Sequence, residues 1–219
     1  MGNALDFFAA TKVVKRIKSP INGEILVVRS LGFGTYIQVE GLTQSGGVVY
    51  DVWKHTLKKV HRTLSTNHHT LILGLGGGSA AKLVRKYYPE AEITGVDLDP
   101  IIVELGKKYL KLEDEKINII ISDALDFLTT HNSQPKTHNF DLILIDMYVG
   151  TEVPKKLETD EFIKKVKLKL AEDGVVVFNR LYYGEKRPLA VKFMHKLEKH
   201  FSSLTPIYPE ANVMYVCRK

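Results

Sequence analysis

Residues 70–81 read Thr-Leu-Ile-Leu-Gly-Leu-Gly-Gly-Gly-Ser-Ala-Ala, and residues 93–99 read Ile-Thr-Gly-Val-Asp-Leu-Asp. The short apolar run Leu71–Leu75 is typical of a buried strand, and Ser79–Tyr88 has the pattern of the helix that follows it. The glycines between them leave a turn with almost no side chains, which lets a ligand approach backbone amides at a helix N-terminus. This stretch therefore predicts a strand, a ligand-binding turn and a helix.

An acid follows this turn at an informative spacing. Asp97 ends the next predicted strand, Glu92–Val96, 23 positions after Gly74. An acid roughly 20 residues beyond such a turn is placed to bind the two hydroxyls of a ribose, which indicates a nucleoside site. Ser79 stands where a dinucleotide fingerprint has Gly or Ala, and the residues after Asp97 continue a single sheet. Enzymes that use S-adenosylmethionine therefore fit the pattern better than dehydrogenases.

The composition is that of an ordinary globular protein. The 219 residues are 44% apolar and 26% charged, which suits one domain with a small appendage. The single cysteine, Cys217, excludes an internal disulfide framework and favours a cytoplasmic protein. No apolar run is long enough for a membrane span, and Met1–Ala10 lacks the features of a secretory signal. The net charge of +6 permits an anionic partner without requiring one.

Residues 1–48 are expected to form a small β unit ahead of the core. Val13–Ile17, Gly23–Ser30 and Thr35–Val39 alternate or carry β-branched residues, with turn sequences between them. Gly41–Gly47 is interpreted as a glycine-rich connection. The β unit therefore precedes a second region, residues 49–219.

The second region is expected to begin with an amphipathic helix, Val49–Arg62. Its polar face carries Lys54, Lys58 and Arg62 at intervals of four. Such a basic stripe is usually a solvated face, and binding of nucleic acid is the less frequent alternative.

From residue 70 on, strands and helices alternate as in a parallel sheet with helical crossovers. The expected strands are 71–75, 92–96, 117–121, 140–145 and 174–178, and the expected helices are 79–88, 100–109, 124–130, 159–171 and 186–201. Two last strands, 203–208 and 213–218, are separated by only four residues and predict an antiparallel hairpin. The fold class is therefore α/β, a mostly parallel seven-stranded sheet with a C-terminal antiparallel hairpin, as in Rossmann-like methyltransferase cores.

Three of the first four predicted strands after residue 70 end in an acid: Asp97, Asp123 and Asp146. Ligands of open parallel sheets bind beyond the carboxyl ends of the strands. Asp97 suits the ribose hydroxyls, Asp123 the exocyclic amine of adenine, and Asp146 a sulfonium or the proton of a nucleophile. Ala124 is small enough to admit the adenine ring. Each acid has a structural alternative, the capping of the next helix, but all three together favour the ligand interpretation.

These motifs resemble the spermidine synthase family. They are Gly74–Gly78, Gly95–Asp99, Ile121–Ala124, Phe140–Asp146 and Leu170–Val177, and with the β unit and its helix the resemblance covers nearly the whole chain. It implies a Rossmann-like core behind a small N-terminal β domain, a loop at 147–159 that gates the active site, and a homodimer.

The resemblance and the strand-end acids together give a set of expected site residues. The residues expected to bind the cofactor are Gln44, Gly74, Gly76, Gly77, Gly78, Asp97, Leu98, Asp123 and Ala124. Asp146 is expected to act as the base or to orient the nucleophile, and Tyr148 to be a hydrogen-bonding partner. The eight histidines have no ligand spacing beside cysteines or acids, so no metal site is expected.

Three departures from the family bear on the reaction. Ser79 stands where the synthases have an acid, Val149 stands where they have a second acid after Asp146, and residues 53–55 read Trp-Lys-His in place of Tyr-His-Glu. Each change removes a negative charge or an acceptor that a diamine needs. Ser79 would also repel a methionine carboxylate less than an acid does.

We therefore expect methyl transfer from S-adenosylmethionine to a small-molecule acceptor. Two alternatives stay open. One is a polyamine aminopropyltransferase (a spermidine synthase) that uses decarboxylated S-adenosylmethionine, and the other is a non-catalytic cofactor-binding module that recruits a partner or an RNA.

Overall fold

The computed structural model describes residues 11–61, 64, 68–130 and 139–219. Its elements, in chain order, are β1 (Thr11–Ser19), β2 (Gly23–Ser30), β3 (Gly34–Val39), β4 (Leu42–Gly46), α1 (Gly47–Val60), β5 (His69–Leu73), α2 (Ser79–Tyr87), β6 (Glu92–Asp97), α3 (Pro100–Leu110), η3 (Leu112–Glu115), β7 (Asn118–Ile121), α4 (Ala124–Thr130), β8 (Phe140–Ile145), η4 (Lys155–Glu158), α5 (Asp160–Lys169), β9 (Leu170–Leu181), α6 (Lys186–Leu197), β10 (Ser203–Ile207) and β11 (Asn212–Arg218). The predictions on Met1–Ala10 and Arg62 concern positions outside the described residues.

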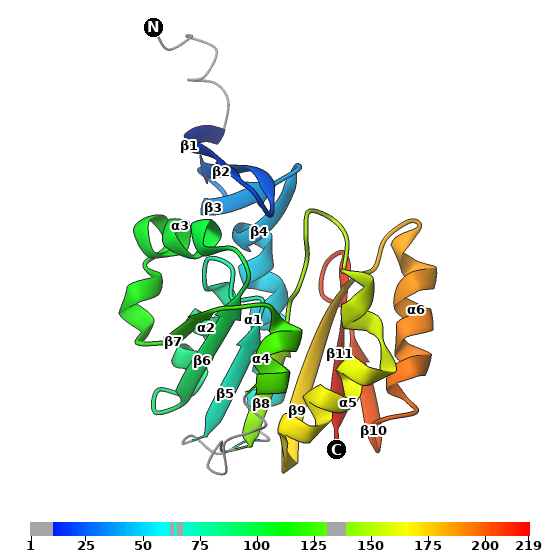
Figure 1. The fold of residues 1–219 in the computed structure, drawn as a ribbon. Coiled ribbons are helices and arrows are strands. Elements are labelled where there is room, and N and C mark those ends of the chain that lie inside the picture. Colours follow the sequence, from blue (N-terminus) through cyan, green and yellow to red (C-terminus); the bar gives the residue numbers. More distant parts are fainter. Residues whose placement is uncertain (1–10, 62–63, 65–67, 131–138) are drawn as a thin grey trace, which may run out of the picture.

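These strands form two sheets (Figure 1). The N-terminal one, called the small sheet below, is antiparallel in the order β1-β2-β3-β4. The large sheet has seven strands in the order β10-β11-β9-β8-β5-β6-β7. Its strands from β9 to β7 are parallel, and the hairpin of β10 and β11 adds to β9 antiparallel. The α/β fold class predicted from the sequence is confirmed.

Helices cover both faces of the large sheet, which is why its central strands are apolar throughout. Along β5, Ile72 joins the core formed with α1, α2 and α3, whereas Leu71 and Leu73 join the core formed with α4, α5 and α6. All three side chains are fully buried. Because both faces are covered, ligands reach this sheet at the ends of its strands.

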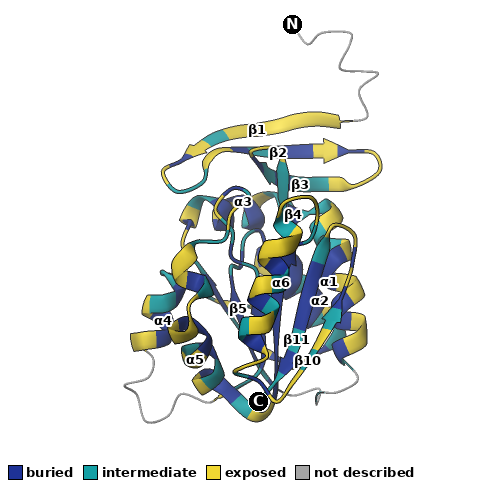
Figure 2. Cartoon of the chain, turned by 90° about the vertical axis from the view of Figure 1, so that its right-hand side faces the viewer, coloured by how far each residue is buried: buried dark blue, intermediate teal, exposed yellow. Residues whose placement is uncertain are grey.

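The small sheet packs on one end of this assembly, and Figure 2 shows that β1 is its exposed edge while β2 carries buried residues. Four of its side chains join the core on the α1–α3 side: Ile25, Val27, Ile37 and Val39. The turn after β1 is tied to the start of α3, because the side chains of Ser19 and Asn22 both donate hydrogen bonds to the buried carboxylate of Asp99. The small sheet is thereby fixed near the carboxyl ends of the parallel strands.

The stretch Gly41–Gly47 contains strand β4, so its interpretation as a connection was wrong. Gly46 serves close packing, because a Cβ at this position would lie 2.6 Å from the carbonyl oxygen of Thr35 on β3. Within β4, the Ser45 hydroxyl accepts a hydrogen bond of 2.7 Å from the amide of Gly77. A strand of the small sheet thus lies directly against the glycine turn.

Helix α1 begins two residues before the predicted start at Val49. Its buried face includes Trp53, and Lys54 and Lys58 are exposed. Of the helices in the described part of the chain, none has the length and apolarity to cross a membrane.

Candidate active site

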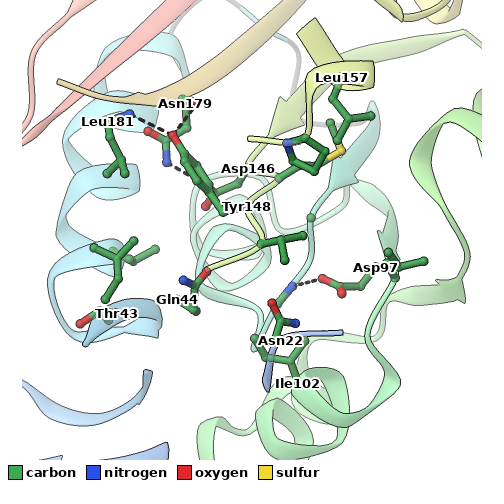
Figure 3. Close-up of a pocket in the computed structure, with 18 of the residues that line it drawn as sticks. Asn22, Thr43, Gln44, Asp97, Ile102, Asp146, Tyr148, Leu157, Asn179 and Leu181 are labelled. Atoms are coloured by element: carbon green, nitrogen blue, oxygen red, sulfur yellow. Dashed lines mark hydrogen bonds between the residues drawn. The ribbon is translucent and has the colours of Figure 1, made fainter. Parts of the chain in front are cut away.

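A pocket opens where β5, β6, β7 and β8 end, and the small sheet, the start of α1 and the β10–β11 hairpin complete its walls (Figure 3). Gly74 and Gly76 come from the turn after β5, Asp97 is the last residue of β6, and Asp146 directly follows β8. The strand ends thus bring together residues far apart in sequence. All the predicted site residues line this pocket except Gly77 and Gly78.

Gly77 and Gly78 do not line this pocket, and their lack of side chains allows other elements to pack against the turn. A Cβ at Gly106 of α3 would lie 2.5 Å from the Cα of Gly77, and a Cβ at Gly78 would lie 2.3 Å from a methyl carbon of Leu112. These glycines make room for neighbouring elements, whereas Gly74 and Gly76 border the pocket itself.

Asp97 holds the glycine turn in place. Its carboxylate accepts a hydrogen bond of 2.6 Å from the amide of Gly76 and one of 2.9 Å from the amide of Asp99 (Figure 3 draws the first). Burial raises the pKa of Asp97 to about 6, although these amide hydrogen bonds favour the ionised form. Asp97 is thus a pocket acid that titrates near neutral pH.

We expect the affinity for methylthioadenosine, a neutral probe with the adenosyl group, to fall as the pH drops below about 6. Protonation of Asp97 removes acceptor capacity that the ribose hydroxyls need. Calorimetric titrations from about pH 5 to about pH 8 measure this change. The raised pKa of Asp97 also makes the stability of the fold depend on pH. Asp97 contributes most to the free energy of unfolding below its unfolded pKa of about 3.9, and this contribution is lost as the pH rises through about 6.

The control is Asp97→Asn, whose affinity for the probe is expected to be weak and independent of pH. Asp123 stays ionised over this range because its pKa is lowered, and the neutral thioether of the probe is insensitive to the charge of Asp146. A wild-type affinity that does not change with pH would contradict the assignment of Asp97 to the ribose.

Asp123 combines helix capping with exposure to the pocket. One carboxylate oxygen accepts from the amide of Leu125 at the start of α4, at 2.9 Å, and the other pairs with the ammonium of Lys156 at 2.5 Å. Burial alone would raise the pKa of Asp123, but the hydrogen bond from Lys156 and the amide lower it below its usual value. Lys156 therefore occupies one side of the carboxylate expected to contact adenine.

The carboxylate of Asp146 accepts hydrogen bonds from two uncharged side chains. The indole nitrogen of Trp53 donates to Oδ2 at 2.7 Å, and the side-chain amide of Asn179 donates to Oδ1 at 2.7 Å. Asn212 in turn donates to the amide oxygen of Asn179 at 2.8 Å. Burial raises the pKa of Asp146 even though both donors favour its ionised form. The result is an oriented carboxylate with enhanced affinity for a proton.

Tyr148 is held by the backbone of β9. Its hydroxyl accepts a hydrogen bond of 2.9 Å from the amide of Leu181 and donates one of 3.3 Å to the carbonyl of Asn179, as Figure 3 shows. Burial raises the pKa of Tyr148 well above its ordinary value, so this residue stays neutral. Its hydrogen bonds fix the first residues of the loop after β8.

Two of the three departures noted in the sequence do not bear on the pocket as expected. The Ser79 hydroxyl is buried and accepts a hydrogen bond of 2.7 Å from the amide of Gly46, so the argument that it faces a methionine carboxylate was wrong. Lys54 and His55 are exposed and do not line the pocket. Val149 does line it.

Sequence reasoning assigned no site role to Trp53, Asn179, Asn212 or Glu210. Asn179 lies near the end of a parallel strand, where the rule used for the acids would have found it. The other three come from α1 and the C-terminal hairpin, whose position relative to the strand ends has no local signal.

The lining of the pocket is acidic although the chain is basic. Its charged side chains are four acids and one base: Asp97, Asp123, Asp146, Glu210 and Lys156. When all are ionised, their formal charge is −4 + 1 = −3, against +6 for the whole chain. The site is therefore suited to a cationic ligand.

Comparisons with known proteins agree with the fold. The chain is 27% identical to a polyamine aminopropyltransferase of Clostridium botulinum over 208 residues, which cover 86% of this chain and 70% of the relative. It is 29% identical to the eEF1A lysine and N-terminal methyltransferase of Mus musculus over 130 residues, covering 56% of this chain and 18% of the relative. The crystal structure of spermidine synthase from Thermotoga maritima superimposes with a TM-score of 0.73 at 22% identity, covering 94% of this chain and 72% of that one.

The family description "Spermine/spermidine synthase domain" matches residues 51–219, which include all the large-sheet strands and all five charged residues of the pocket lining. The resemblance seen in the sequence is thereby confirmed. This chain belongs to the spermine/spermidine synthase family.

Proposed function

We propose that this protein transfers an aminopropyl group from decarboxylated S-adenosylmethionine to an amine. The observation that carries the proposal is the acidic lining. It contains four carboxylates and one ammonium, that of Lys156, which is already paired with Asp123. The decarboxylated donor carries a sulfonium and an ammonium, and both are attracted by such a lining. S-adenosylmethionine carries a carboxylate that the decarboxylated donor lacks. The one base of the lining that could pair with this carboxylate, Lys156, already pairs with Asp123.

The order of the two transferase hypotheses drawn from the sequence is thereby reversed. The argument from Ser79 no longer supports methyl transfer, because that side chain is turned toward β4. The name of the Clostridium botulinum relative also favours aminopropyl transfer.

In the proposed reaction, the amine attacks the methylene carbon by which the aminopropyl group is bonded to the sulfonium sulfur. The C–N bond forms as the C–S bond breaks, and the bonding electron pair leaves with sulfur as neutral methylthioadenosine. Asp146 accepts the proton that the attacking nitrogen loses, a role favoured by its raised pKa. Trp53 and Asn179 hold the carboxylate in one orientation during this step.

The remaining pocket residues bind the adenosyl group. In this proposal Asp97 accepts from the ribose hydroxyls, and Asp123 with Ala124 borders the adenine. The amides of the glycine turn approach the nucleoside at Gly74 and Gly76, where no side chain intervenes. Gln44 and Leu98 complete this part of the lining.

Methyl transfer is the second candidate, and one observation favours it. Val149 lines the pocket at the position where the family pattern has a second acid. The pocket therefore lacks a negative charge that would favour binding of a diamine. A relative named as a methyltransferase is consistent with this alternative.

The homodimer and the division at residue 48 remain part of the proposal. Exposed apolar side chains, Val13 on β1 and Leu31 and Phe33 in the turn between β2 and β3, support an interface there.

Parallel calorimetric titrations with decarboxylated S-adenosylmethionine, S-adenosylmethionine and methylthioadenosine test the proposal. We expect the decarboxylated donor to bind tightest, by about tenfold over S-adenosylmethionine, or about 1.4 kcal/mol. Tighter binding of S-adenosylmethionine would restore the methyl-transfer hypothesis.

A further inference from the structure

Arg180 is a buried cation of β9 that has no part in the reaction as described above. Its exposed fraction is 4%, and the residues on either side of it, Asn179 and Leu181, line the pocket whereas Arg180 does not. Successive side chains of a strand point to opposite faces. The guanidinium of Arg180 accordingly lies on the α6 side of the sheet, where its central carbon is 3.9 Å from the ring centre of Phe193. A positive charge is thus buried behind residues of the pocket wall.

The guanidinium of Arg180 has fewer partners than a buried arginine normally has. Nη1 donates a hydrogen bond of 2.7 Å to the carbonyl of Asn179, but among the described residues neither Nε nor Nη2 has a hydrogen-bond acceptor. Glu158 of η4 forms an ion pair with Nε at 3.6 Å, too long for a hydrogen bond, and this acid is partly exposed. Burial of a cation without full hydrogen bonding costs free energy and needs an explanation.

One residue connects this cation to Asp146. The backbone carbonyl of Asn179 accepts from Arg180, and the side-chain amide of Asn179 donates to the carboxylate of Asp146 at 2.7 Å. Burial raises the pKa of Asp146, and the positive charge of Arg180 opposes this rise because it favours the ionised carboxylate. The contacts of Arg180 thus lead to the carboxylate that is proposed to act as the base.

The other titratable groups around Arg180 and Asp146 do not supply this charge. They are Tyr148 from the loop after β8, Glu158 from η4 and Tyr215 from β11. Burial raises the pKa of both tyrosines well above their ordinary value, so they are neutral near pH 7. Of the cations in the described part of the chain, Arg180 is the one whose charge lowers the pKa of Asp146.

We propose that Arg180 is a positioning residue whose charge, held behind Asn179, keeps the carboxylate of Asp146 ionised and ready to accept the proton of the attacking amine. The inference rests on the proposed function, because Asp146 is the base of that reaction. The two unpartnered nitrogens of the guanidinium leave much of its charge uncompensated, which is what this role requires.

The test follows the ionisation of Asp146 through the fluorescence of Trp53, the one tryptophan of the chain, whose indole donates to this carboxylate. We expect the wild type to show a fluorescence transition with pH that is absent in Asp146→Asn. In Arg180→Met the midpoint of this transition should move to higher pH by about one unit, as expected for loss of a nearby opposite charge. Arg180→Lys, which restores a cation, should recover most of the difference.

The fold is expected to tolerate Arg180→Met. The Met side chain fills most of the space of the arginine stem against Phe193, and the carbonyl of Asn179 keeps the hydrogen bond that it accepts from Tyr148. The substitution also removes a buried charge that was incompletely hydrogen-bonded.

Two controls separate the charge of Arg180 from its packing. Glu158→Gln weakens the same contact between η4 and β9 but keeps the cation, so the midpoint should not rise. Arg187→Met removes an exposed arginine that lies over the ring of Tyr182 and should leave the midpoint unchanged. Equal midpoints in the wild type and Arg180→Met would overturn the inference, and so would an equal rise in Glu158→Gln.

Because the fluorescence titration needs no turnover, its failure is distinct from failure of the proposed function. In kinetic assays, the acid limb of the pH profile of kcat should move in Arg180→Met by as much as the fluorescence midpoint, with little change in KM for the donor. A limb that stays in place would exclude a role of Arg180 in the reaction. A wild type that shows the fluorescence transition but forms no product would contradict the proposed function, while the effect of Arg180 on Asp146 would stand.

Discussion

Replacement of Asp146 by Asn is expected to lower kcat by about 10²- to 10⁴-fold, the range for loss of a positioned general base. The Asn side chain cannot accept the proton that the attacking amine loses. Binding of methylthioadenosine should change little, since Asp97 and the glycine turn hold the adenosyl group in the proposed complex. Steady-state kinetics and calorimetry on the same preparation measure the two effects.

The substitution also has a structural cost. Trp53 and Asn179 both donate to Asp146, so an amide at residue 146 places its NH₂ group against a donor, at a cost of about 1–3 kcal/mol. Assays therefore need a temperature well below the unfolding midpoint of the variant. The matched control is Asp141→Asn on β8, the strand that Asp146 follows; the Asp141 carboxylate accepts from the amide of His69, and this residue does not line the pocket. A kcat of Asp146→Asn close to that of this control would exclude Asp146 as the base.

Replacement of Gly74 by Ala is expected to destabilise the protein by about 4 kcal/mol. A Cβ at this position would lie 2.1 Å from the carbonyl oxygen of Asp146, and the residue has a φ of +85°. Because the obstacle is backbone, no side-chain rotation relieves the contact. The change also displaces Asp146, so activity should be lost in any folded fraction. Denaturant unfolding followed by circular dichroism measures the free energy of unfolding.

Gly41→Ala separates the two causes. Gly41 has a similar φ of +80°, but a Cβ there would meet no atom within 4 Å. Its expected cost is only that of the left-handed backbone, about 1–2 kcal/mol. Equal destabilisation by the two substitutions would mean that the contact between the glycine turn and Asp146 is not as close as described.

Most of the large sheet could be predicted from the sequence, because its strands are apolar runs bounded by turn residues. The strand predicted at 140–145 has the observed bounds of β8, and Asp97 and Asp146 lie at the ends of β6 and β8 as expected. Strand β4 was missed because its five residues, Leu-Thr-Gln-Ser-Gly, lie among glycines that resemble a loop. One of them, Gly46, is required by close packing against β3, which is a tertiary cause.

The site could be predicted only in part. The three acids were found because parallel strands end at one edge of the sheet, a rule that holds without knowledge of side-chain packing. The role of Trp53 could not be predicted, because its hydrogen bond to Asp146 spans 93 positions of the sequence and depends on how α1 packs. The direction of Ser79 likewise depends on β4. Helix capping and ligand binding were treated as alternatives, yet Asp123 both caps α4 and lines the pocket.

The most direct measurement is the identity of the products formed when the protein is incubated with both donors, decarboxylated S-adenosylmethionine and S-adenosylmethionine, and with 1,4-diaminobutane. Mass spectrometry distinguishes the two reactions. The acidic lining predicts methylthioadenosine together with a diamine that has gained an aminopropyl group. Formation of S-adenosylhomocysteine with a methylated amine would contradict aminopropyl transfer, and binding of the donors without any product would leave only a cofactor-binding module.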